Sequence, residues 1–241
     1  MQVPLYPHEK TEDLQCKGLR LIQSSREYRF TTDAVLLANF CRDMTGKKCV
    51  ELCAGSGVIS LLLAAKKRPS HITAVELQPQ LCDMMRRSVA LNDLQEVIDV
   101  VCEDVKNFRA QADVVVCNPP YRKADSGERQ RAHNIALCRH EICLTLSDVV
   151  GCAARLLNNK GSFYLVHQSS RLAEIITLCN QSLLAVKEIL PVCPSPGKNP
   201  NLVLIHAQKQ GRSDCVLRFP LSVTDENGQY TPQAKAWYGI R

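Results

Sequence analysis

Short apolar runs alternate with longer amphipathic runs along the chain from about residue 48. The short runs are rich in Val, Ile and Leu and have the length of buried strands. Seven strands are expected, at 47–53, 71–77, 97–104, 112–118, 161–168, 183–192 and 201–209. Helices are expected between them, at 58–68, 79–93, 141–157 and 171–183. This alternation predicts an α/β fold built on a doubly wound, mostly parallel, seven-stranded sheet.

About 45 residues precede the first of these strands, which opens around Lys48. Their last part, FTTDAVLLANFC at 30–41, has helical periodicity, and Thr32 or Asp33 is in position to cap that helix. The chain has 241 residues, 45% of them hydrophobic, and shows no repeat or low-complexity linker, which suits one large core. We therefore expect a single domain over 1–241, with 1–47 as an extension and 48–241 as the core with a C-terminal tail.

The composition bears on the cellular location of the protein and on its binding partners. No run approaches the roughly 20 apolar residues of a membrane helix, and the N-terminus, MQVPLYPHEK, lacks the pattern of a signal peptide. We therefore expect a cytoplasmic protein that does not bind membranes. The net charge of +6 suits a polyanionic partner such as nucleic acid, although a solvated basic face is the commoner cause of such a balance.

Thirteen cysteines and six histidines raise the question of disulfides or a metal. The number of cysteines is odd, no two are spaced as Cys-x-x-Cys, and most lie in apolar runs, where cysteine behaves as a small hydrophobe. The histidines show no metal-ligand spacing against cysteine or a carboxylate. We expect reduced, buried thiols and no metal site.

A glycine turn follows the first strand of the predicted sheet. The strand leads through Glu51 into Gly55 and Gly57, and a helix begins there. Glycine allows close approach of a ligand, although tight turns use it anyway. The next strand ends at Glu76, about twenty residues later, where a carboxylate can accept from both hydroxyls of a ribose. Together they indicate a nucleoside cofactor, but not a dinucleotide, because Ser60 replaces the third glycine of that motif.

Polar residues also end the next two strands. Asp104, followed by Val105, ends the third strand, where an acid can accept from the amine of an adenine. Asn118 ends the fourth. Because parallel strands end at one edge of a sheet, we expect these residues to lie with Glu51 and Glu76.

Two prolines follow Asn118, in the motif Asn118-Pro119-Pro120-Tyr121. Proline has no N–H for a sheet, so an ordinary exit turn is the plain interpretation. The loop RKADSGERQRAHN comes next, either as a solvated connector or as part of a site, since loops at this edge carry the chemistry of open α/β sheets. Its basic residues are Arg122, Lys123, Arg129 and Arg131. The loop 193–201 is a second candidate or a plain connection.

Four motifs in this order, ELCAGSG, AVELQ, CEDV and NPPY, resemble those of amino-methyltransferases that depend on S-adenosylmethionine (SAM). More narrowly, TEDLQCKGLRLIQ, FTTDAVLLANF, ELCAGSGVISLLLA, RHE and the C-terminal FPLSVTDENGQYTPQAKAWYG resemble the YfiC-type tRNA-Val (adenine-37-N6) methyltransferase family. The general resemblance covers residues 48 to about 209, and the narrower one begins near Thr11. It implies a Rossmann-like methyltransferase fold, SAM as cofactor, and adenine 37 of a valine tRNA as target.

The resemblance also assigns roles to residues. Around SAM it places Glu51, Gly55 and Gly57 at the methionine part, Glu76 at the ribose, Asp104 and Val105 at the adenine, and Thr32 and Asp33 in a helix that closes over the cofactor. For catalysis, the side-chain oxygen of Asn118 and the carbonyl of Pro119 would hold the two N–H groups of the target amine. Pro120 would fix the backbone, and Tyr121 would stack on a planar target.

Two other functions compete with this interpretation. Protein glutamine-N5 methyltransferases use the same Asn-Pro-Pro-Tyr, because a carboxamide nitrogen also has a delocalised lone pair. The basic loop and the lack of a separate N-terminal helical domain favour RNA. An RNA-binding module with an inactive methyltransferase fold conflicts with intact Glu76, Asp104 and Asn118. We expect N6-methylation of an adenine in RNA, with tRNA as partner.

Overall fold

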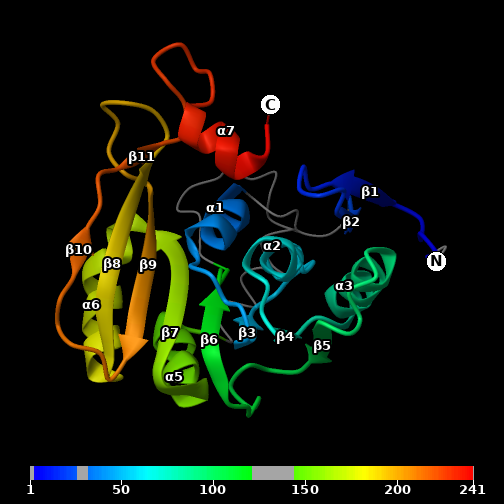
Figure 1. Ribbon diagram of the computed structural model, residues 1–241, viewed down its shortest axis with the longest axis horizontal. Coiled ribbons are helices and arrows are strands. Elements are labelled where there is room, and N and C mark those ends of the chain that lie inside the picture. Colours follow the sequence, from blue (N-terminus) through cyan, green and yellow to red (C-terminus); the bar gives the residue numbers. More distant parts are fainter. Residues whose placement is uncertain (1–2, 26–31, 121–143, 241) are drawn as a thin grey trace, which may run out of the picture.

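A nine-stranded sheet forms the centre of the computed structural model, which describes residues 3–25, 32–120 and 144–240 (Figure 1). The strand order is β10-β8-β9-β7-β6-β3-β4-β5, and β11 also pairs with β8. The strands are β3 (Lys48–Leu52), β4 (His71–Glu76), β5 (Ile98–Cys102), β6 (Ala112–Cys117), β7 (Leu157–Gln168), β8 (Leu184–Cys193), β9 (Leu202–Lys209), β10 (Val216–Leu217) and β11 (Leu221–Ser222).

The seven long strands, β3 to β9, are the seven predicted from the sequence. Among them only β9 is antiparallel to its neighbours. The two-residue strands β10 and β11 extend the sheet beyond the predicted number, and both pair in parallel with β8. They are too short to leave a period-two pattern in the sequence.

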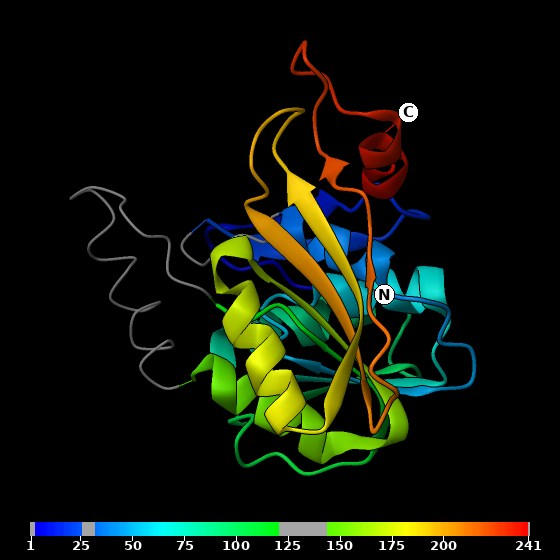
Figure 2. The same ribbon diagram turned by 90° about the vertical axis from the view of Figure 1, so that its left-hand side faces the viewer.

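Helices cover both faces of the sheet (Figures 1 and 2). On one face lie α1 (Thr32–Phe40), α2 (Val58–Lys67) and α3 (Pro79–Leu91); on the other lie α5 (Leu146–Leu156) and α6 (Leu172–Gln181). Successive residues of a strand point to opposite faces, so Val114 and Val116 join one core while Val115 and Cys117 join the other. Strands buried on both faces explain the continuous apolar runs, and the doubly wound prediction is confirmed.

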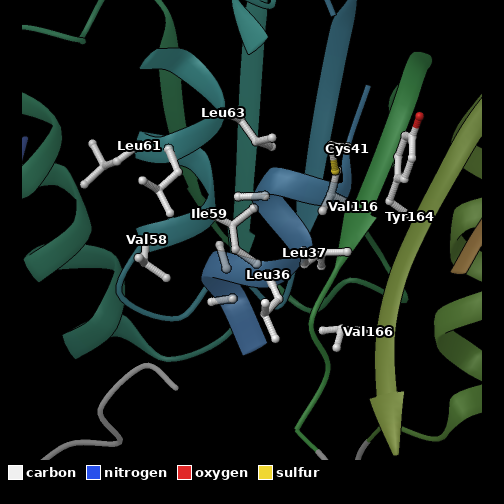
Figure 3. Close-up of a cluster of buried hydrophobic side chains, with 14 of the residues drawn as sticks. Leu36, Leu37, Cys41, Val58, Ile59, Leu61, Leu63, Val116, Tyr164 and Val166 are labelled. Carbon is white, nitrogen blue, oxygen red and sulfur yellow. The ribbon is translucent and has the colours of Figure 1, made fainter. Parts of the chain in front are cut away.

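Helix α1 packs in the core between α2 and β7. Figure 3 shows Leu36 and Leu37 of α1 facing Ile59 of α2 and Val166 of β7. The helix begins at Thr32, so Asp33 lies inside its first turn rather than before it. The residue that precedes the helix lies outside the described part of the chain.

Two segments near the ends of the chain form elements that the pattern did not predict. The antiparallel hairpin β1 (Glu9–Asp13) and β2 (Arg20–Ser24) lies beside α3 (Figure 1). There the backbone N–H of Ile22 donates to the Ser88 hydroxyl at 2.9 Å. Helix α7 (Pro232–Tyr238) crosses α1, where the Asn39 amide donates to the Trp237 carbonyl at 2.9 Å.

Two connections in the C-terminal half of the described chain follow β7 and β8. A 3-10 turn, η2 (Ser169–Arg171), joins β7 to α6, and the loop 193–201 links the antiparallel strands β8 and β9 as a hairpin connection. Strand β7 begins at Leu157, before the predicted start at residue 161. Among the described residues, no helix has both the length and the apolar character needed to span a membrane.

Candidate active site

The carboxyl end of β3 lies where the strand order reverses. From β3 the chain first builds β4 and β5 on one side, and then β6 and β7 on the other. The register sets Leu52 of β3 beside Val75 of β4 and Cys117 of β6, so the three strands end close together. In open α/β sheets the crevice at such a switch point is where ligands bind.

Glu76 closes the glycine turn against the end of β4. One oxygen of its buried carboxylate accepts from the backbone N–H of Gly55 at 2.9 Å, and the other accepts from the N–H of Gln78 at 3.0 Å. A carboxylate offers about four lone-pair directions. Two remain after these bonds, one on each oxygen, which is the number that a pair of neighbouring hydroxyls requires.

The two glycines of the turn are needed for different reasons. Both have positive φ, +57° at Gly55 and +85° at Gly57, which L side chains rarely adopt. A Cβ at Gly57 would lie 2.5 Å from Cγ of buried Met85, so this position also lacks room. A Cβ at Gly55 would meet nothing within 4 Å, so open space adjoins the turn there.

Glu51 is a buried carboxyl one residue before the end of β3. The hydroxyl of Ser60, in the first turn of α2, donates to it. Burial raises the pKa of Glu51 to about 8, the Ser60 hydrogen bond opposes this shift, and the charge of Glu76 adds to it. A cation bound nearby would favour the ionised form. Ser60 was not predicted as a partner of Glu51, and its one mark in the sequence is a hydroxyl within the apolar run VISLLLAA.

Asp104 and Val105 follow β5 and lie next to Glu76. The backbone N–H of Glu103 donates to the Glu76 carbonyl at 3.0 Å, which ties this turn to the end of β4. The half-buried carboxylate of Asp104 accepts from the N–H of Lys106 at 2.9 Å and lies 3.7 Å from its ammonium group. Val105 is buried.

Asn118, Pro119 and Pro120 leave the end of β6, beside β3. Asn118 and Pro120 are half-buried, and Pro119 is buried. The structure thus gathers at one edge the predicted residues Glu51, Gly55, Gly57, Glu76, Asp104, Val105 and Asn118. Thr32 and Asp33 begin α1 on the adjoining face. Tyr121, Arg122, Lys123, Arg129 and Arg131 lie outside the described residues.

The cysteines are spread through the fold, and Cys53 and Cys117 lie at the same edge of the sheet as the site. Over residues 3–25, 32–120 and 144–240, no three His, Cys, Asp or Glu side chains gather as a metal group. Every cysteine in that part of the chain is a free thiol, and most are buried, because they belong to the apolar faces of strands and helices.

The polar groups at this edge fit a nucleoside cofactor: a buried carboxylate with acceptor directions beyond its two backbone bonds, a glycine turn beside open space, and a further acid just after β5. The fold and this edge define a Rossmann-like methyltransferase with S-adenosylmethionine as its cofactor. The chain belongs to the methyltransferase small domain family, whose model matches residues 30–189. The expected enzyme class is thereby confirmed.

Two curated relatives are similar over most of their length, and both are named tRNA1(Val) (adenine(37)-N6)-methyltransferase. The protein of Shewanella woodyi is 27% identical, over 84% of this chain and 87% of its own. The protein of Phocaeicola vulgatus is 28% identical, over 86% of this chain and 89% of its own.

Solved structures agree on the fold. A protein of Agrobacterium tumefaciens, described as a predicted O-methyltransferase, has a TM-score of 0.69 at 24% identity and covers 86% of this chain and 96% of its own. TYW2 of M. jannaschii, solved in complex with AdoMet, has a TM-score of 0.60 at 13% identity and covers 85% of this chain and 88% of its own. These likenesses support the sheet and its helices as a methyltransferase fold.

Proposed function

We propose that this protein transfers a methyl group from SAM to N6 of adenine 37 in a valine tRNA. The observation that carries the proposal is the position of Asn118-Pro119-Pro120 at the end of β6, beside the strand that carries Glu51. The names of relatives that match most of the chain supply the target. We also propose that the protein acts in the cytoplasm, which an RNA partner would support.

Each group of residues at this edge would bind a different part of the cofactor. Glu76 would hold the ribose hydroxyls with its two free acceptor directions, and Asp104 with Val105 would bind the adenine. Glu51 and the turn of Gly55 and Gly57 would surround the methionine part, while Thr32 and Asp33 of α1 would border it. SAM supplies a methyl group on a positively charged sulfur, whose departure as a neutral thioether is easy.

The catalytic task of the protein is to position an amine. The lone pair of an adenine amine is delocalised into the ring, so the amine is a poor nucleophile. The side-chain oxygen of Asn118 and the carbonyl of Pro119 would each accept one N–H and direct the lone pair at the methyl group. Pro120 limits backbone movement, and Tyr121 would stack on the ring. Such catalysis relies on orientation and electrostatics and needs no side-chain nucleophile.

The basic loop after Tyr121 would grip the RNA. An amine inside a folded RNA must be splayed out before it reaches such a pocket. Cationic side chains hold the phosphates on either side, with a salt dependence that a protein substrate need not share. We assign this role to Arg122, Lys123, Arg129 and Arg131.

The test offers labelled SAM with three substrates: a valine tRNA transcript, its variant with guanine at position 37, and a release factor as glutamine substrate. We expect label on the first alone, because guanine presents a carbonyl where Asn118 and Pro119 require an NH2 group. Equal label on both transcripts would contradict the adenine target. Label on the release factor would replace the RNA by a protein substrate.

A further inference from the structure

The outer edge of the sheet carries apolar side chains that no core covers. Strand β10 ends the strand order over the residues that the structure describes, and it pairs with β8 on its other side. Val216, Leu217 and Phe219 are 55%, 70% and 96% exposed. Figure 1 shows β10 at the border of the molecule, away from α1 and the hairpin. Large apolar residues on an open strand edge invite pairing with another strand.

The backbone of this edge fixes how another strand can pair with it. The N–H of Arg218 donates to the Ile189 carbonyl of β8 at 2.9 Å. Backbone N–H and C=O groups alternate in direction along a strand. Those of Val216 therefore also point toward β8, and those of Cys215 and Leu217 point outward. An antiparallel partner would therefore bond to Cys215 and Leu217. Val216 would then fall in a close pair that is not hydrogen-bonded.

The charges along the edge are arranged symmetrically. Asp214 and Arg218 each lie two residues from Val216, on opposite sides. Their side chains are 71% and 56% exposed, although each also has an ion-pair partner within the chain, Lys187 and Glu188. A two-fold axis at Val216 would set Asp214 of one copy opposite Arg218 of the other, twice. Opposite charges facing each other across two strands stabilise the pair.

The other face of the edge is apolar and fits the same axis. With Val216 opposite its own counterpart, Leu217 of each copy lies opposite Cys215 of the other. The two Leu217 and two Cys215 side chains form one apolar group, and Phe219 of each copy flanks it at either end. A self-complementary patch of this kind is what a two-fold interface requires.

We propose that a second copy of this chain docks on the β10 edge, with the two β10 strands antiparallel about Val216, to form a symmetric dimer with one continuous sheet. The proposal is independent of the methyl-transfer function. An RNA base could stack on Phe219, but it would have no need of opposite charges placed symmetrically about Val216.

Disulfide trapping tests the register. In a Cys215→Ser background, Val216→Cys sets two thiols opposite each other in a pair whose Cα atoms lie about 4.5 Å apart, within the range of a disulfide. Oxidised glutathione should link this variant into a dimer that a reducing agent separates. Leu217→Cys in the same background faces serine and should link far less. Equal linking of the two variants, or none, would overturn the proposed pairing.

Sedimentation of the full chain tests the dimer itself. Wild type should show a reversible monomer–dimer equilibrium, and Leu217→Lys should raise its dissociation constant about tenfold or more, because two charges enter the apolar group. Leu183→Lys, at a residue 65% exposed outside this edge, is the matched control and should change little. Unchanged SAM affinity in both variants shows an intact fold. A wild-type protein that is monomeric at every concentration would overturn the proposal. If Leu217→Lys then also lost RNA binding, the edge would be an RNA-binding surface instead.

Discussion

At the scale of residues, the buried carboxylate of Glu76 links the glycine turn to the end of β4. Its bonds to the N–H groups of Gly55 and Gln78 fix its orientation before any ligand arrives. Glu76→Ala removes the acceptor for two hydroxyls, so we expect the SAM dissociation constant to rise by about 10-fold to 150-fold, or roughly 1.5 to 3 kcal/mol. Calorimetry measures this, with exposed Glu96→Ala as control. Unchanged affinity in Glu76→Ala would rule out the assigned ribose contact.

Glu51 should make stability depend on pH. Its pKa in the folded protein is about 8, above the ordinary 4.5, so the folded state keeps a proton that the unfolded chain releases. The stability contributed by neutral Glu51 is therefore complete below pH 4.5 and is lost as the pH rises toward 8. Relative to Glu51→Gln, the free energy of unfolding of wild type should fall by up to about 1.4 kcal/mol per pH unit.

Denaturant titrations between pH 6.5 and 8 measure this difference best. Burial lowers the pKa of His167 and of His206 to about 4, so both are neutral in the folded protein over that interval. In the unfolded chain they bind protons near their ordinary pKa of 6.5, but wild type and Glu51→Gln share this contribution, so it cancels in the comparison. Burial also raises the pKa of the Cys41, Cys49 and Cys117 thiols above the same interval. Parallel stability curves for wild type and Glu51→Gln would show that Glu51 ionises normally.

The sequence predicted residues whose position follows from the end of a strand, and missed those that depend on packing. Glu51, Glu76, Asp104 and Asn118 could be placed at one edge because parallel strands all end there. The bond from Ser60 to Glu51 depends on how α2 lies over β3, and no periodicity encodes that.

At the scale of elements, the turn from β3 to α2 determines where the backbone can approach a ligand. Gly57→Ala would be destabilised both by its positive φ and by the close contact with Met85. Gly46→Ala has a similar φ, +75°, but its Cβ would enter free space. We expect a loss of about 1 kcal/mol for Gly46→Ala and about 1 to 3 kcal/mol more for Gly57→Ala. Thermal and denaturant unfolding compare them.

Gly55→Ala separates ligand approach from stability in the same turn. Its Cβ would enter open space, so its stability should match that of Gly46→Ala while its SAM affinity falls. Equal SAM affinity in the two variants would mean that the cofactor does not approach Gly55.

Long buried elements could be predicted from the sequence, and short or half-exposed ones could not. The strands of the sheet are continuous apolar runs because both faces are covered. Strand β1, EKTED, has no buried residue, and its pairing with β2 beside α3 depends on contacts such as that of Ser88. Strands β10 and β11 exist only because β8 offers them an edge.

At the scale of the whole molecule, we propose that the chain unfolds as one domain. Trp237 is the only tryptophan, and it lies in α7, which packs on α1 at the core. Its fluorescence reports on the C-terminal tail, while circular dichroism reports on the sheet and helices. The two unfolding curves should coincide. An earlier transition in fluorescence would make the tail a separate unit.

We propose that Asn118 holds the amine that receives the methyl group. Methyl transfer to the valine tRNA transcript and SAM affinity, both measured on one preparation of Asn118→Ala, test this role. Because Asn118 serves the target rather than the cofactor, we expect transfer to fall by about 100-fold or more while the SAM dissociation constant stays near that of wild type. Transfer above about a tenth of the wild-type rate, or a loss of SAM binding that explains the defect, would contradict this role.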